Sequence, residues 1–360
     1  MNKWQQALLQ KGGCLLRWAS SIYILAAQNP LRFIAWAVAD CNQNPAKRES
    51  IERKKGKIMA YSGIGGQAVM EGVMMKNQEV YAVAVRKPDH EIVVEKKQYT
   101  GVCKNAFLKN MVFVRGIFNF IDSMVLGISC LTFSASFYEE EEEAPKPRSE
   151  KREKAEMGVT VALAVVMAVA IFMALPFYAS LFFQRFFHSE TLVLLAEGAL
   201  RILIFVGYLL MISQMEDIRR VFMYHGAEHK CINCIEHGLD LTLENVRNSS
   251  REHKRCGTSF LFVVIIVSVI ATMFIRADSR ILRLLLRLAI IPLIAGVSYE
   301  FIRLAGRSEN PIVNLLSKPG MLLQRLTTRE PDEEMIEVGI ASVEAVFDWK
   351  PYVEKLRNGK

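Results

Sequence analysis

Hydrophobic residues gather in long runs along the second half of the chain, with charged residues between them. Four runs are long enough to cross the ~30 Å hydrocarbon core of a bilayer as helices. They cover residues 159–183, 191–213, 258–275 and 282–305. The first and third contain no charged residue, and Pro292 with Gly296 predicts a kink in the fourth. The pattern predicts an α-helical membrane protein with about four transmembrane helices.

The few charged residues inside these runs can pair with one another. Glu197 and Arg201 are four residues apart and share one helix face, so they can neutralise each other. Arg287 lies early in the fourth run. Near its end, Glu300 either pairs with Arg303 or turns toward a functional site, and the sequence leaves both options open.

A different pattern, typical of a small β-rich unit, occupies residues 60–105. Residues 80–86 alternate as in a strand, 87–90 have turn chemistry, and 91–97 return as a second strand. Before them, the glycine-rich segment 65–75 lacks the spacing of a nucleotide-binding loop. Its glycines therefore indicate tight turns or close backbone approach.

The remaining segments complete the division of the chain. Residues 106–138 are apolar but carry three charges, which fits an amphipathic or re-entrant helix as well as a transmembrane one. A charged linker at 139–157 leads to the first two spans at 158–213, and 306–360 predicts cytoplasmic C-terminal helices. Residues 1–58 lack this patterning, so we expect an N-terminal extension whose deletion leaves membrane insertion and folding intact.

Lysine and arginine counts predict the orientation. Residues 214–257 hold seven of them, whereas the loop between the first two spans holds only Arg185. Such an excess marks the cytoplasmic side. We therefore expect a multi-pass protein of the cell inner (plasma) membrane with 214–257 and both termini in the cytoplasm. A full crossing by 106–138 would break that parity.

Composition changes this picture little. Of 360 residues, 51% are hydrophobic, and the net charge of +8 fits basic cytoplasmic loops. No nucleic-acid-binding signature accompanies the charge, so nucleic acid is not expected as a partner. The seven cysteines are an odd number spread over a long chain, which indicates reduced thiols rather than a disulfide scaffold.

The candidate chemistry lies between the second and third spans. Four of the six histidines and three of the seven cysteines fall between residues 225 and 256. On a helix, His225 and His229 are one turn apart and can share one metal ion, while Glu228 can polarise a water. His253 and Cys256 are the next nearest ligand types. We expect a divalent metal here, with zinc favoured by nitrogen and sulfur ligands.

A structural metal site is the other possibility. Cys231 and Cys234 have zinc-knuckle spacing, and they could join His253 and Cys256, or His237, around a structural ion. Alternatively, both cysteines are small apolar core residues.

A short helix is also expected to begin after Thr242. Glu244 starts it, and Asn245 and Arg247 are expected to face the site. These three residues are therefore further polar candidates, together with Glu300.

Six blocks of the sequence stand out as long motifs: 65–74, 224–230, 244–247, 255–260, 298–300 and 326–331. Together they resemble the YqhQ-like family of bacterial membrane proteins, over about residues 60–345. That family is catalogued as a domain of unknown function and is often labelled a predicted metal-dependent enzyme. The resemblance thus implies a metal but no known reaction or substrate.

The resemblance also implies roles for individual residues. The ligands it implies are His225, His229, His253 and Cys256. Glu228 would be the acid/base, with Glu71 as a second catalytic carboxylate and Gln67 as a polar group brought in from the N-terminal unit. Cys231 and Cys234 do not belong to the family pattern, which weakens them as a ligand pair.

The function predicted is a membrane-integral, divalent-metal-dependent enzyme, hydrolytic in type, with its site on the cytoplasmic face. The alternative is a non-enzymatic membrane assembly or quality-control factor with a structural metal or a polar core. A transporter using Glu197, Arg201 and Glu300 ranks third, because the bundle is small for one. The lipid bilayer is the expected partner. The substrate is not indicated, and a homo-oligomer or a membrane-protein partner stays open.

Overall fold

The computed structural model of the protein describes residues 61–138, 150–275, 277, 279–308 and 310–358. The expected extension 1–58 lies outside the described residues. The stretch from Met59 to the C-terminus forms one compact unit. Within it, α6 begins at Glu150, so the last part of the expected linker is helical.

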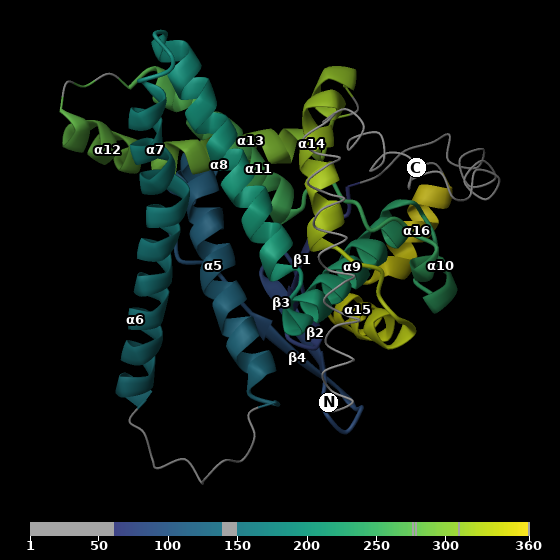
Figure 1. Ribbon diagram of the computed structural model, residues 1–360. Helices are drawn as coiled ribbons and strands as arrows, with labels where there is room; N and C mark the ends of the chain where they lie inside the picture. The colour runs from purple at the N-terminus through teal and green to yellow at the C-terminus, as the bar shows by residue number, and fades with distance from the viewer. Residues whose placement is uncertain (1–60, 139–149, 276, 278, 309, 359–360) are drawn as a thin grey trace, which may run out of the picture. The chain divides into compact units, whose positions relative to one another are not determined.

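The β-rich unit is a four-stranded antiparallel sheet in which each strand pairs with the next (Figure 1). Its strands are β1 Ile64–Val69, β2 Gly72–Asn77, β3 Val80–Arg86 and β4 Ile92–Gln98. The last two agree with the strands expected at 80–86 and 91–97. The glycine-rich segment forms the first hairpin.

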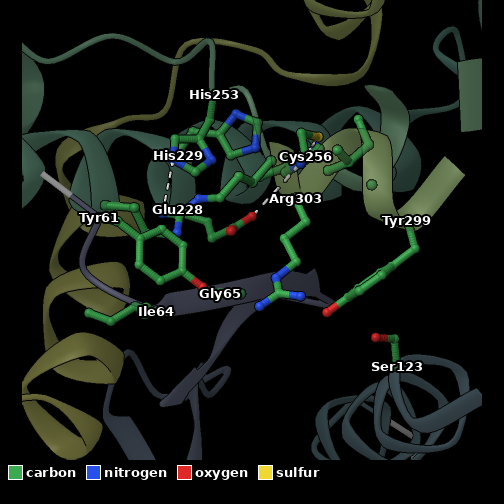
Figure 2. A pocket seen from close by; sticks show the side chains of 17 residues that line it. Tyr61, Ile64, Gly65, Ser123, Glu228, His229, His253, Cys256, Tyr299 and Arg303 are labelled. Carbon is green, nitrogen blue, oxygen red and sulfur yellow. Dashed lines mark hydrogen bonds and ion pairs between the residues drawn. The ribbon is translucent and has the colours of Figure 1, made fainter. Parts of the chain in front are cut away.

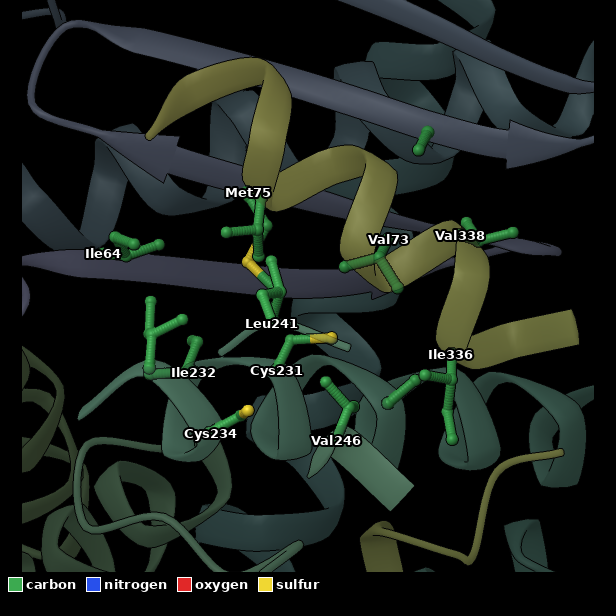
Figure 3. Packing of buried hydrophobic residues seen from close by; sticks show 14 of the residues in the cluster. Ile64, Val73, Met75, Cys231, Ile232, Cys234, Leu241, Val246, Ile336 and Val338 are labelled. Carbon is green, nitrogen blue, oxygen red and sulfur yellow. The ribbon is translucent and has the colours of Figure 1, made fainter. Parts of the chain in front are cut away.

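The two faces of the sheet pack on different helices, because successive side chains of a strand point to opposite faces. Val73 and Met75 pack with the helices α9 Glu216–Glu236 and α15 Glu333–Val346 (Figure 3). Met74 and Val83 pack on the other side, against Leu126 of α5 Val114–Ala135. The sheet is therefore buried between helices on both faces.

The remaining helices follow in chain order. They are α4 Ala106–Asn110, α6 Glu150–Val169, the π-helical turn Ala170–Ala174, α7 Leu175–Phe183, α8 Glu190–Ile212, α10 Leu243–Arg247, α11 Gly257–Met273, α12 Arg280–Ala289, α13 Ile291–Ala305, α14 Pro311–Thr327 and α16 Trp349–Arg357. The described part of the chain is thus mostly helical, with one small antiparallel sheet.

Four helical segments are long and apolar enough to cross a membrane: Val114–Ala135, Gly158–Phe183, Glu190–Ile212 and Ile281–Ala305. The number agrees with the expectation, but the set differs. The stretch expected at 258–275 is α11, whose 17 residues make it shorter than these four. The kink expected in the last stretch is a change of helix, since α12 ends at Ala289 and Pro292 lies in the first turn of α13.

Candidate metal centre

The histidine pair lies on α9, as its spacing predicts. The ring centroids of His225 and His229 are 4.4 Å apart. Nδ1 of His225 lies 2.8 Å from the Thr327 carbonyl oxygen, and Nδ1 of His229 lies 2.6 Å from the Arg251 carbonyl oxygen. A carbonyl can only accept, so each Nδ1 carries the proton and donates. Each Nε2 is then left as the ligand atom, the usual arrangement behind a metal-binding histidine.

Cys256 brings a thiol to the same point from another element. It is the N-cap residue of α11, and its Sγ accepts from the Thr258 amide at 3.4 Å. The same Sγ lies 3.3 Å from Nε2 of His225. The ligand atoms of His225, His229 and Cys256 all lie within 4.8 Å of one another, close enough to hold one metal ion.

Electrostatics prepares these residues as ligands. Burial alone would raise the pKa of the Cys256 thiol, but the imidazoles of His225 and His229 outweigh burial and hold this pKa well below its ordinary value. Burial likewise opposes charge on His225, yet the Cys256 thiolate and the Glu228 carboxylate raise its pKa to about 9. Without metal, the site therefore contains a thiolate beside an imidazolium.

His253, the fourth expected ligand, is held by other groups. Its ring centroid is 5.6 Å from that of His229, but its Nε2 lies 3.5 Å from Oε2 of Glu236. Arg255 donates to the other oxygen of the same carboxylate. Burial opposes ionisation of Glu236, but these partners bring its pKa down to about 2. Three of the four expected ligands thus converge, while His253 belongs to a neighbouring ionic network.

Glu228 lies beside the ligands because the sheet leaves room for it. Its Oε2 is 3.7 Å from Nε2 of His225, and the residue is 5% exposed. A Cβ at Gly66 of β1 would lie only 2.7 Å from Cγ of Glu228. The glycine-rich strand therefore permits the close approach that its composition indicated.

A cavity of about 340 Å³ opens onto the cluster (Figure 2). His225, Glu228, His229 and Cys256 line one side of it. The remaining walls come from the segment before β1, from α5 and from α13, and include Tyr61, Ser123, Tyr299 and Arg303. The cluster is thus accessible to a small ligand from one direction.

Two comparisons with known proteins identify relatives. Residues 111–349 match the family described as "Protein of unknown function (DUF1385)". A protein of Bacillus subtilis (strain 168), described as "Uncharacterized protein YqhQ", is 35% identical over 286 residues, which is 77% of this chain and 90% of that protein. The chain belongs to the YqhQ-like family. The resemblance seen in its motifs is thereby confirmed, and no solved structure matches it.

Two residues from the YqhQ-like motif at 65–74 do not line the cavity. Glu71 forms an ion pair with Arg220 and accepts from the Tyr224 hydroxyl at 3.2 Å, so it lies on α9 about one turn before His225. Gln67 packs against Gly127 of α5. Gln67 follows Gly66 in the strand, and successive residues point to opposite faces, so the expected approach of its side chain to the site is wrong.

The polar residues expected to face the site from α10 do not reach it either. The helix begins after Thr242 as predicted, and Glu244 lies in its first turn. Asn245 donates to the Asp240 carbonyl at 2.9 Å, and Arg247 pairs with Glu333 at 2.6 Å. Both side chains are therefore used to hold α10 in place rather than to line the cavity.

Glu300 takes a third option that the sequence did not suggest. Both of its oxygens accept from Arg115 of α5, at 2.6 and 2.5 Å, while Arg303 lies 3.8 Å away. Arg303 is thus left to line the cavity. Cys231 and Cys234 are fully buried in the core formed by α9, α15 and the sheet, which agrees with their interpretation as apolar residues.

Several supporting residues were missed from the sequence. Asn233 donates to the carbonyls of Ser250 and Glu252, at 2.6 and 3.0 Å, and so fixes the Arg251 carbonyl between them. A signal for it was present, because Asn233 continues the spacing of His225 and His229 along one face of α9. The Thr327 carbonyl had no such signal, because any residue carries a carbonyl.

Proposed function

We propose that this protein is a membrane-integral, divalent-metal-dependent enzyme of hydrolytic type, in which His225, His229 and Cys256 hold zinc. The observation that carries this proposal is the convergence of three ligand atoms within 4.8 Å on the wall of a cavity. Catalytic zinc sites use three protein ligands and keep one position open, whereas structural sites close with four.

The remaining cavity residues suit hydrolysis. A divalent ion at these ligands would supply Lewis acidity and allow water to ionise near neutral pH. Glu228 would take the proton from the attacking water and return it to the leaving group. Arg303, from the opposite wall, would hold the substrate oxygen that becomes negative.

The membrane placement proposed here follows from the shared core. Residues of β1–β3, α9, α15 and α16 pack in one cluster, so these segments lie on the same side of any bilayer that the chain crosses. Leu126 and Cys130 of α5 pack on the sheet, which argues against a full crossing by that helix. Positive charge between α8 and α11 favours the cytoplasm for this side. Reporter fusions at the C-terminus and in the loop after α7 should therefore report opposite compartments.

A structural role is the second candidate, because the cluster lies where separate elements meet. Its ligands come from α9 and from the start of α11, and the supporting carbonyl of Thr327 ends α14. A metal bound there would connect these elements, as expected for an assembly factor. In that case Glu228 could complete a closed set of four ligands.

Cobalt substitution separates the two candidates without knowledge of the substrate. Co²⁺ bound to Cys256 should give a thiolate charge-transfer band that is lost in Cys256→Ser. Azide or acetohydroxamate should shift the visible bands if a coordination position is open to the cavity. Unchanged bands at saturating azide and acetohydroxamate would indicate a closed, structural site and contradict the enzyme proposal. Glu228→Gln should keep the metal and remain responsive to both compounds.

A further inference from the structure

A second cavity, of about 660 Å³, lies at the other end of α11 from the metal cluster. Cys256 and Gly257 at the start of α11 line the first cavity, whereas Thr272 and Met273 at its end line the second. A helix of 17 residues is about 25 Å long, so the two sites are separate. The other walls of the second cavity come from the end of α7, the start of α8 and α12.

Three charged side chains are buried beside this cavity. Glu197, Arg201 and Arg287 are 2%, 5% and 2% exposed. Arg201 and Arg287 both donate to the same oxygen of Glu197, at 2.8 and 2.6 Å. Two guanidinium groups thus share one carboxylate, and the trio keeps a net charge of +1. Uncompensated charge is costly in apolar surroundings, so such groups mark functional sites.

Arg287 is fixed in place but keeps a free donor. Its guanidinium lies over the Phe177 ring, 4.8 Å from the centroid, and its Nε has no hydrogen-bond partner among the described residues. Arg283, one turn earlier on α12, lines the same cavity and donates to the Ala277 carbonyl at 2.8 Å. A rigid guanidinium with an unused N–H is suited to bind a phosphate or carboxylate oxygen.

The outer face of α12 indicates where this anion comes from. Ile281 and Leu285 are 71% and 55% exposed, on the side away from Arg283 and Arg287. An apolar face opposite an arginine face is typical of helices that lie in the membrane interface, at the level of lipid headgroups. Apolar side chains such as Phe187, Val193 and Met273 complete the cavity wall.

We propose that this cavity binds the phosphate headgroup of an anionic phospholipid, with Arg287 and Arg283 as its ligands. The phosphate would balance the net charge of the buried trio, and the acyl chains would lie along the apolar wall and the exposed leucines of α12. Glu197 does not oppose this binding, because its charge is already shared between two arginines. The site is independent of the metal cluster and of the proposed enzymatic function.

The test uses the full chain, purified in detergent and depleted of lipid. Dioctanoyl-phosphatidylglycerol should raise the thermal unfolding temperature in a saturable manner, whereas dioctanoyl-phosphatidylcholine and inorganic phosphate at equal concentrations should not. Arg287→Gln and Arg283→Gln should each weaken phosphatidylglycerol binding roughly tenfold or more, the loss expected for one charge-assisted hydrogen bond. Arg283→Gln leaves the buried trio intact, so it serves if Arg287→Gln does not fold.

Arg185→Gln is the matched control. Arg185 lies in the loop between α7 and α8, at the same end of the bundle, and is exposed outside the cavity. It should bind phosphatidylglycerol like the wild type. An equal response to phosphatidylcholine would show lipid binding without recognition of the anion, and an equal response to inorganic phosphate would show a free-phosphate site. Either result overturns the proposal, as does wild-type affinity in the Arg283→Gln variant.

Discussion

Gly226 controls how closely α9 approaches the segment that supports His225. In this segment, Arg329 donates its amide to the Phe222 carbonyl at 2.8 Å, so α9 and residues 327–331 run in contact. A Cβ at position 226 would overlap the Arg329 carbonyl oxygen and would lie 3.2 Å from its carbonyl carbon. The obstacle is backbone, which cannot rotate away as a side chain can.

Gly226→Ala should therefore weaken zinc binding. The segment must retreat by on the order of 1 Å to restore ordinary contact. The distance from Nδ1 of His225 to the Thr327 carbonyl, now 2.8 Å, would then exceed hydrogen-bond reach. Loss of such a supporting bond typically costs 10–100-fold in metal affinity. Overpacking by about 1–3 kcal/mol should exceed the gain of ~1 kcal/mol in helix propensity, so the variant should also be less stable.

Competition with a chromophoric chelator measures the zinc affinity, and thermal unfolding measures the stability. Gly207→Ala in α8 is the matched control, because nothing lies within 4 Å of a Cβ there. It should bind zinc like the wild type. If Gly226→Ala folds and also keeps wild-type zinc affinity, the Thr327 carbonyl does not support the ligand, and the reasoning fails.

Three further outcomes are expected. Zinc must displace a proton from His225, whose pKa is raised to about 9, while Cys256 is already ionised; the apparent affinity should thus fall roughly tenfold per pH unit below pH 9, and a profile that levels off near pH 7 would contradict this. His253→Gln should keep the bound metal but lower stability, because Glu236 loses a buried partner; loss of the metal would restore His253 as a ligand. Glu71→Gln should keep the metal and lower the free energy of unfolding by roughly 1 kcal/mol in a denaturant titration, since its ion pair with Arg220 is half exposed; loss of metal would place Glu71 in the site.

Local patterns predicted much of this molecule. Alternation and turn residues gave β3 and β4 to within a residue, and the 225/229 spacing placed both histidines on one helix face. Cys256 was also found, because its distance along the chain is bridged by a loop that returns to α9. These features depend on short-range geometry that sequence spacing reports directly.

Long-range pairing explains the failures. Glu300 was weighed against Arg303, its neighbour on the same helix, but Arg115 of α5 takes it. Glu197 and Arg201 were expected to neutralise each other, yet Arg287 adds a second guanidinium from α12. Similarly, nothing in the spacing of His253 shows that Glu236 holds it. Sequence separation does not reveal which distant charge reaches a side chain first.

Metal content tests the central claim most directly. The full chain should be purified without added chelator, reconstituted with zinc, dialysed and analysed for metals, with His229→Ala and His237→Ala in parallel. His237 is the matched control, because it lies at the end of the same helix and its Nδ1 contacts the Asn233 carbonyl rather than the cluster. The account predicts about one zinc per chain in the wild type and in His237→Ala, and almost none in His229→Ala. A wild type that retains no metal, or a His229→Ala variant that retains as much as the wild type, would contradict it.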